Sequence, residues 1–289
     1  MPDILYIDGR FTTTDEKVLS VEDRGFQFGD SVYEAIKFLN RRPLLIEDHF
    51  RRMGNGLREL EIRSPWTRDE FLNLCDEILS KTAFSEGLIY VQVTRGVSER
   101  AHFYPDNLEP TALAYTRRVP FPDPVKKERG IRAVTTEDIR WKHCNVKSVN
   151  LLGNMIAKKR AQRAGVEEAL LVIDGEVKEG ASSNFFAVRE GRVITHPSDS
   201  RILSGTVRDR VISLALGARI RVDERPVRDY ELLRVDEAFI TSTTQGVMPV
   251  GEIDGRVIGN SRRGEVTGTL QKLYDTLERQ QAGMGALEA

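Results

Sequence analysis

The sequence is poor in several features that mark particular classes of protein. Its 289 residues include only two cysteines, Cys75 and Cys144, and neither belongs to a Cys-x-x-Cys motif, so zinc and dithiol redox chemistry are not expected. The longest aliphatic run, from Ala169 to Ile173, is far below the ~20 apolar residues that a membrane-spanning helix requires. We therefore expect neither a metal site nor a membrane partner.

An excess of charge of either sign is also missing. Lys and Arg number 43 and Asp and Glu number 44, giving a net charge of −1, whereas broad binding to nucleic acid requires a large basic excess. The beginning of the chain, Met1-Pro2-Asp3, lacks the basic segment and following apolar stretch of a secretion signal. We expect a cytoplasmic protein that does not bind nucleic acid.

Three generic catalytic motifs are absent as well. The sequence has no Gly-x-x-x-x-Gly-Lys phosphate loop, no His-Glu-x-x-His and no Gly-x-Ser-x-Gly elbow. Phosphate transfer from nucleotides, zinc-dependent hydrolysis and α/β-hydrolase chemistry are therefore disfavoured.

Local signals for both strands and helices are present. Turn-forming pairs at Asp8-Gly9, Asp174-Gly175 and Asp254-Gly255 stand between apolar runs and predict three antiparallel hairpins. Thr67 is a predicted N-cap, followed by a helical stripe of apolar residues: Phe71, Leu74, Cys75, Ile78 and Leu79. Further helices are predicted at about 151–164, 205–216 and 265–280.

Length and proline placement predict two domains. The chain is close to twice a ~150-residue domain, and three prolines at alternate positions, Pro120, Pro122 and Pro124, favour an extended connector. We predict an N-terminal domain at 1–118, a linker at 119–124 and a C-terminal domain at 125–289. Because strands and helices do not alternate strictly, both domains are predicted to be α+β, with antiparallel or mixed sheets.

Four segments in chain order resemble one enzyme family: Arg24 to Glu34, Asp138 to Leu152, Glu179 to Asn184, and Thr241 to Thr244. Together they are similar to the class IV, or fold type IV, aminotransferases that use pyridoxal 5′-phosphate (PLP), and most similar to those acting on D-amino acids. The resemblance implies a two-domain fold with the cofactor site between the domains, and a C-terminal domain that binds PLP.

Two residues carry the chemistry that this resemblance implies. Lys147 matches the lysine of the family pattern Lys-Ser-x-Asn, whose amine forms a Schiff base with the cofactor and then moves the Cα proton. Glu179 matches the carboxylate beside the pyridine nitrogen, which favours the protonated ring as an electron sink. Neighbouring Lys142 lies outside the motif and is interpreted as structural. Without the resemblance, either site residue would be read as an ordinary solvated side chain.

The resemblance also implies how the phosphate is bound. Arg52, at the end of the His-x-x-Arg pattern that begins at His49, offers a planar guanidinium able to donate two parallel hydrogen bonds. The turn from Leu203 to Arg208 enters a helix, whose N-terminal N–H groups suit an anion. Relatives more often have Gly-Ile-Thr-Arg here, so the hydroxyl of Thr206 stands one residue early, and the amides of Thr206 and Val207 are the expected donors.

One further position departs from the family pattern. Ala181 stands where Ser or Thr is usual, so a hydroxyl from Ser182 or Ser183 would have to compensate. The expected cofactor contacts are Arg52, Lys147, Glu179, Ser182, Ser183, Leu203, Thr206, Val207, Ser242 and Thr243.

Substrate choice is expected to depend on a trap for the α-carboxylate. The Arg-x-His pair of Arg100 and His102 resembles that of D-amino acid aminotransferases, with the Tyr33 phenol as a third donor. In the family this loop reaches over the partner subunit's site, which implies a homodimer.

The expected reaction transfers the amino group of a D-amino acid, such as D-alanine, to 2-oxoglutarate, giving a 2-oxo acid and D-glutamate. Alternatives are a lyase that splits 4-amino-4-deoxychorismate, a branched-chain L-amino acid aminotransferase of the same fold, and a non-catalytic vitamin B6 binder. The pair at Arg100 and His102 argues against the first two.

Overall fold

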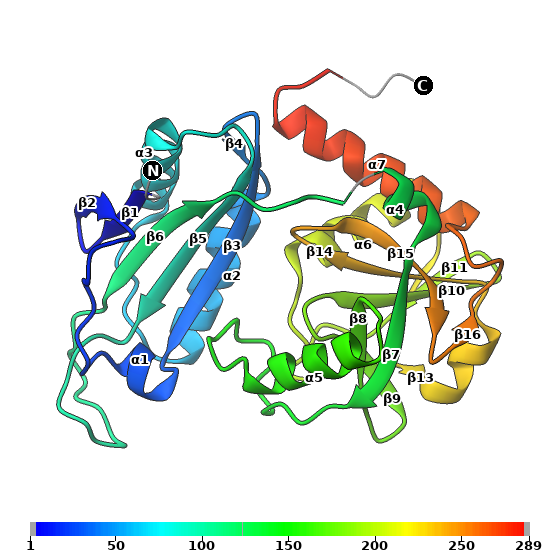
Figure 1. The fold of residues 1–289 in the computed structure, drawn as a ribbon, viewed down its shortest axis with the longest axis horizontal. Coiled ribbons are helices and arrows are strands. Elements are labelled where there is room, and N and C mark those ends of the chain that lie inside the picture. Colours follow the sequence, from blue (N-terminus) through cyan, green and yellow to red (C-terminus); the bar gives the residue numbers. More distant parts are fainter. Residues whose placement is uncertain (1–3, 123, 286–289) are drawn as a thin grey trace. The chain divides into compact units, whose positions relative to one another are not determined.

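The computed structural model describes residues 4–122 and 124–285. Contacts divide the chain into two compact units (Figure 1). The described residues within 1–120, 146–150 and 278–289 form unit 1, and those within 121–145 and 151–277 form unit 2. No helix in the described part of the chain has the length and apolar composition needed to span a membrane.

Unit 1 is built on a six-stranded antiparallel sheet with the strand order β2-β1-β6-β5-β3-β4. Because side chains alternate across a strand, one face of this sheet packs against helices and the other carries a row of tyrosines. The elements are β1 (Ile4–Ile7), β2 (Arg10–Thr13), α1 (Arg24–Phe28), β3 (Ser31–Leu39), β4 (Arg42–Pro43), α2 (Ile46–Glu59), α3 (Arg68–Lys81), β5 (Gly87–Thr94) and β6 (Ala112–Arg117).

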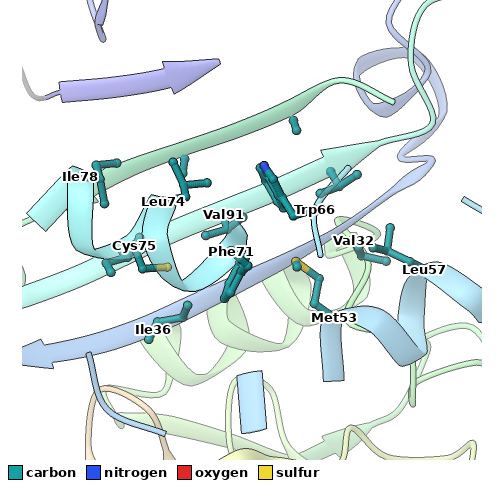
Figure 2. Packing of buried hydrophobic residues seen from close by; sticks show 14 of the residues in the cluster. Val32, Ile36, Met53, Leu57, Trp66, Phe71, Leu74, Cys75, Ile78 and Val91 are labelled. Atoms are coloured by element: carbon teal, nitrogen blue, oxygen red, sulfur yellow. The ribbon is translucent and has the colours of Figure 1, made fainter. Parts of the chain in front are cut away.

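Helix α3 forms where its apolar stripe and N-cap predict it. The Thr67 side chain accepts a hydrogen bond from the Glu70 N–H while the Glu70 carboxylate accepts from the Thr67 N–H, a capping box that satisfies two backbone donors. All five residues of the predicted stripe are buried. Figure 2 shows Phe71, Leu74 and Cys75 packed beside residues of the sheet. Cys75 is thus a core residue, as predicted.

Unit 2 contains a ten-stranded mixed sheet with the order β12-β11-β10-β14-β15-β7-β8-β9-β13, and β16 pairs with β15. Three pairs are parallel, β11–β12, β15–β7 and β7–β8, and the others are antiparallel. The strands are β7 (Ile131–Glu137), β8 (Glu168–Ile173), β9 (Glu176–Gly180), β10 (Asn184–Arg189), β11 (Arg192–Thr195), β12 (Val222–Glu224), β13 (Val227–Arg228), β14 (Glu237–Ser242), β15 (Gly246–Ile253) and β16 (Arg256–Val257). The predicted α+β class with antiparallel and mixed sheets is confirmed.

Three of the remaining helices lie close to their predicted ranges: α5 (Leu152–Arg163), α6 (Thr206–Gly217) and α7 (Glu265–Gln281). The short helix α4 (Pro124–Arg129) and the 3₁₀ helix η1 (Asp229–Arg234) were not predicted. The three predicted hairpins are confirmed as β1–β2, β8–β9 and β15–β16. In each turn both central residues have positive φ, for example 44° at Asp8 and 88° at Gly9, the conformation that suits a two-residue hairpin.

The two compact units differ in two segments from the ranges predicted for the domains. Residues 146–150 and 278–285 fall in unit 1, although the sequence-based boundary assigns them to the C-terminal range. Ser148 forms a β-bridge with Val32, and Glu278 pairs with Lys37, so both segments are held by β3. The predicted linker at 119–124 and the domain boundaries around it stay a prediction.

Candidate functional site

Lys147 is held against strand β3 by its own backbone. Its carbonyl accepts a hydrogen bond from the Tyr33 N–H at 2.9 Å, and the next residue, Ser148, forms the bridge to Val32. The Lys147 ammonium lies 4.3 Å from the centre of the Tyr33 ring. Within the described residues this amine has no acidic partner, so no ion pair holds it away from an aldehyde.

Tyr33 begins a row of stacked aromatic rings on the second face of the unit 1 sheet. Its ring stacks on Tyr90 at 5.5 Å, and Tyr90 stacks on Tyr115 at 5.0 Å. These residues come from β3, β5 and β6, which are neighbours in the sheet. Burial raises the pKa of the Tyr90 phenol, so this hydroxyl stays protonated and donates to Gln92 at 2.8 Å. The row fixes the plane of the Tyr33 ring.

Arg52 lies on α2 and points at a buried carboxylate. Its Nε is 2.8 Å from Glu34 Oε1 and its Nη2 is 2.6 Å from Glu34 Oε2, a two-point ion pair. His49, one turn earlier on α2, places Nδ1 2.7 Å from Glu34 Oε2. Burial raises the pKa of Glu34, but the charge of Arg52 and the hydrogen bonds from Arg52 and His49 outweigh it and hold that pKa at about 2.

Arg100 and His102 both lie beside the Phe28 ring at the end of α1. The Arg100 guanidinium carbon lies 4.6 Å from the centre of the Phe28 ring, and the His102 ring lies 6.1 Å from the same centre. Both side chains are exposed. The structure therefore brings the two residues together, while Tyr33 belongs to the separate row of stacked rings around Lys147.

Glu179 is the centre of a polar network in unit 2. It is 3% exposed at the end of β9 and accepts from Arg140 Nη1 at 2.6 Å and from Asn184 Nδ2 at 2.9 Å. The Leu203 N–H points at both of its oxygens at 3.2 Å. Arg140 is itself held by a two-point contact with Asp138. A carboxylate fixed from several sides can present one orientation to a ligand.

The ionisation of Glu179 reflects two opposing effects. Burial raises its pKa to about 7, and the charge and hydrogen bond of Arg140 act in the other direction. Although burial opposes it, hydrogen bonding to Asp138 and the charge of Glu179 raise the pKa of Arg140. Arg140 therefore remains a cation, and a second cation beside Glu179 would complete the ionisation of the carboxyl group.

The two serines after Ala181 share one buried hydrogen-bond acceptor in unit 2, although Ser182 is exposed and only Ser183 is buried. Ser183 Oγ donates to Glu168 Oε2 at 2.9 Å, and Ser182 Oγ donates to the same oxygen at 3.3 Å. Glu168 is fully buried and also pairs with Lys158 at 2.8 Å. Both hydroxyl protons are thus donated to Glu168, and each serine keeps only acceptor capacity for another group.

Helix α6 starts at Thr206 after a glycine N-cap. Gly205 has no side chain to accept the first N–H groups of the helix, and a Cβ at this position would collide with Asn184 Oδ1. Thr206 and Val207 are both buried in the first turn. This turn has the backbone donors and the positive dipole end that suit an anion.

Ser242 and Thr243 lie where β14 ends and the turn to β15 begins. Ser242 Oγ accepts from the Gln245 N–H at 3.3 Å, which closes this turn. The preceding hydroxyl, Thr241 Oγ1, is buried and has no hydrogen-bond partner among the described residues. A buried hydroxyl of this kind is a donor without an internal acceptor.

Several residues of these networks were not identified from the sequence. They are Glu34, Asp138, Arg140, Glu168 and Asn184. Glu34, Arg140 and Glu168 act through contacts with residues distant in the chain, whereas Asp138 holds nearby Arg140 and Asn184 contacts nearby Glu179. A partial signal exists, because Glu34 interrupts an apolar strand and Asp138 and Arg140 lie inside a segment that carries the family resemblance. Nothing in the sequence pairs them with their partners.

Comparison with known proteins identifies the family. The model of amino-transferase class IV matches residues 31–253. A D-alanine aminotransferase of Bacillus licheniformis is 38% identical over 91% of this chain and 93% of its own length, and one of Staphylococcus haemolyticus is 35% identical over 94% and 96%. A branched-chain aminotransferase from Thermoproteus uzoniensis, solved with norvaline, superposes with a TM-score of 0.88 at 26% identity, covering 98% of this chain and 96% of the other. The motifs, the fold and these likenesses agree, and the chain belongs to the class IV aminotransferases.

Proposed function

We propose that this protein is a PLP-dependent D-amino acid aminotransferase. It transfers the amino group of a D-amino acid such as D-alanine to 2-oxoglutarate and yields a 2-oxo acid and D-glutamate. The observation that carries the proposal is the likeness to D-alanine aminotransferases over more than nine-tenths of the chain. Branched-chain enzymes share the fold at lower identity.

The residues present fit PLP as the cofactor. The first turn of α6 and the unpartnered Thr241 hydroxyl offer donors that suit a phosphate. The Glu179 carboxylate suits a protonated ring nitrogen, and the Lys147 amine suits an aldehyde. PLP is a phosphorylated pyridine aldehyde. The carboxylate suits its ring nitrogen, the amine suits its aldehyde, and the hydrogen-bond donors suit its phosphate.

In the proposed mechanism, bound PLP supplies an aldehyde that takes up the amino group and a ring that accepts the electron pair left at Cα. Lys147 Nζ would hold the cofactor through its aldehyde carbon and, once freed, would move the proton from Cα to that same carbon. Glu179 holds a proton at the ring nitrogen, with Arg140 keeping the carboxylate ionised and oriented.

The remaining predicted contacts orient the cofactor and the substrate. Arg52, the start of α6 and the Ser242 turn bind the phosphate, and the Leu203 backbone holds Glu179 in place. Because Ser182 and Ser183 donate to Glu168, we propose that they support the cofactor by acceptance or through Glu168. The α-carboxylate is bound by the Tyr33 phenol of one subunit together with Arg100 and His102 on the loop that reaches over from the other.

We further propose a cytoplasmic homodimer. The loop that carries Arg100 exposes large apolar side chains, with Phe103 82% and Val97 45% exposed, and Phe26 on α1 is 74% exposed. Apolar groups of this size are typical of surfaces covered by another chain. Both cysteines are free thiols, which suits a reducing compartment. Light scattering should give the mass of two chains, and the mass of one would contradict the dimer.

A panel of D- and L-amino acids with 2-oxoglutarate as the common acceptor tests the proposed reaction. We expect pyruvate from D-alanine, because a carboxylate anchored at one place presents a single face of Cα to Lys147. Turnover of L-leucine in place of D-alanine would contradict the proposal and favour a branched-chain enzyme. Pyruvate released from 4-amino-4-deoxychorismate without an acceptor would instead indicate the lyase.

The same panel tests whether Arg100 binds the α-carboxylate of the substrate. Replacement Arg100→Ala removes a charge-assisted contact and is expected to raise KM for D-alanine by about tenfold or more, with a smaller change in kcat. Arg118→Ala is the matched control, because Arg118 is also exposed and also packs on a phenylalanine ring, that of Phe84. An equal effect of both substitutions on KM would remove Arg100 from the trap.

A further inference from the structure

Glu34 is a buried carboxylate that the proposed reaction does not use directly. It lies on β3 next to Tyr33, but faces α2 because neighbouring side chains point to opposite sides of a strand. It is 0% exposed, and its two oxygens are occupied by the Nε and Nη2 groups of Arg52. Such a contact fixes the plane of the guanidinium as well as its position.

His49 completes the arrangement on the same side of Glu34. A carboxylate only accepts hydrogen bonds, so the 2.7 Å contact with Glu34 Oε2 places the His49 proton on Nδ1. Burial, together with the nearby charges of Arg52 and Lys147, lowers the pKa of His49, despite Glu34. The imidazole is therefore neutral, and Glu34 and Arg52 form the charged pair.

Charge and geometry predict opposite effects of Glu34 on an anion bound by Arg52. Considered as charge alone, Glu34 neutralises Arg52 and repels a phosphate, so its removal should tighten binding. Considered as geometry, it holds one edge of the guanidinium, and its removal should weaken binding because Arg52 loses its fixed direction. The two-point contact and complete burial favour the second effect.

We propose that Glu34 is a positioning residue that, steadied by His49, orients the guanidinium of Arg52 toward the phosphate of the cofactor. This inference rests on the proposed function, because it assigns the phosphate to Arg52. It predicts that Glu34 affects recognition of the phosphate and not of the pyridine ring. A residue that merely stabilises the fold would affect both alike.

The test compares binding of PLP with binding of pyridoxal, which lacks the phosphate, by visible absorbance of the refolded or cofactor-stripped full chain. Glu34→Gln keeps the shape and removes the charge. We expect it to lower the affinity for PLP relative to pyridoxal by about tenfold, the effect of one charge-assisted hydrogen bond. In an Arg52→Lys background, where no planar fork remains to orient, the same substitution should leave the ratio unchanged.

A matched control comes from a second buried ion pair in unit 1. Asp30 Oδ2 accepts from Arg24 Nε at 3.0 Å and from Arg95 Nε at 2.7 Å. Asp30→Asn is expected to lower the melting temperature, as Glu34→Gln does, without changing the ratio of PLP to pyridoxal affinity. If Glu34→Gln does not fold, Glu34→Asp serves instead. Its side chain is one methylene shorter, so the carboxylate no longer reaches Arg52 in the same way, and the ratio of PLP to pyridoxal affinity should fall.

The possible results distinguish a failure of the Glu34 positioning role from a failure of the proposed PLP-dependent function. A wild-type protein with no preference for PLP over pyridoxal would overturn both. A wild-type preference that Glu34→Gln retains or increases would overturn the positioning role alone, and an equal loss with Asp30→Asn would show that Glu34 acts only on the fold.

Discussion

Replacement of Lys147 by alanine is expected to abolish transamination, lowering kcat by at least about 10³-fold, because proton transfer at Cα loses its only covalently positioned base. The amine lies over the Tyr33 ring without an acidic partner among the described residues. The measurement is the initial rate with D-alanine and 2-oxoglutarate, together with the visible absorbance of the purified protein.

The spectrum makes this experiment decisive. Lys147→Ala should lose the covalently bound cofactor and its absorbance, whereas Lys142→Ala, at an exposed lysine nearby, should retain both absorbance and rate. A Lys147→Ala protein that keeps the absorbance and the rate would exclude Lys147 as the cofactor lysine. Absorbance kept without turnover in the wild type would favour the simple vitamin B6 binder.

Replacement of Glu179 by glutamine is expected to lower kcat by about 10²-fold, because an amide cannot hold the ring nitrogen protonated and the electron sink is weakened. The substitution preserves size and can keep the hydrogen bond from the Leu203 N–H. The rate of Cα proton removal, followed with D-alanine deuterated at Cα, measures the effect directly.

The control for Glu179 is a second glutamate of unit 2. Glu237 accepts from the N–H groups of Val266 and Thr267 at the start of α7, and no cofactor contact is assigned to it. Glu237→Gln should leave the rate of proton removal within about threefold of wild type. An equal loss in both variants would mean that the Glu179 effect is one of stability.

The raised pKa of Glu179 also predicts how pH affects the cofactor-free protein. This pKa is about 7 in the folded protein, compared with the ordinary value of 4.5. Between these values the folded state binds more protons than the unfolded state, so the contribution of Glu179 to stability is present below pH 4.5 and is lost as pH rises through 7. Denaturant unfolding should show wild type losing stability relative to Glu179→Gln across this window.

Much of the local structure of this chain follows from short sequence patterns. The stripe after Thr67, the glycine-containing hairpin turns and the ranges of α5, α6 and α7 depend on contacts within a few residues. Helix periodicity, capping and turn geometry are local properties, so they can be read before the fold is known. The family itself was also recognisable, because four motif segments stand in order along the chain.

Long-range pairings could not be predicted in this way. Arg52 was identified as a phosphate ligand by resemblance, but nothing near it in the sequence shows that Glu34 holds its guanidinium. In the same way, Arg140 follows strand β7 and donates to Glu179 on strand β9, 39 residues further along the chain. These contacts depend on strand order and on which face of a strand each residue occupies.

The sequence by itself determined the fold class, the helices α3, α5, α6 and α7, the three hairpins, the family and the types of residue that carry its chemistry. Only the tertiary structure decided the environment of those residues: a neutral His49 beside an ionised Glu34, a Glu179 with a raised pKa, and serine hydroxyls committed to Glu168. The physical reason is that ionisation and orientation depend on burial and on charged partners brought together across the fold, and neither is encoded within a short stretch of chain.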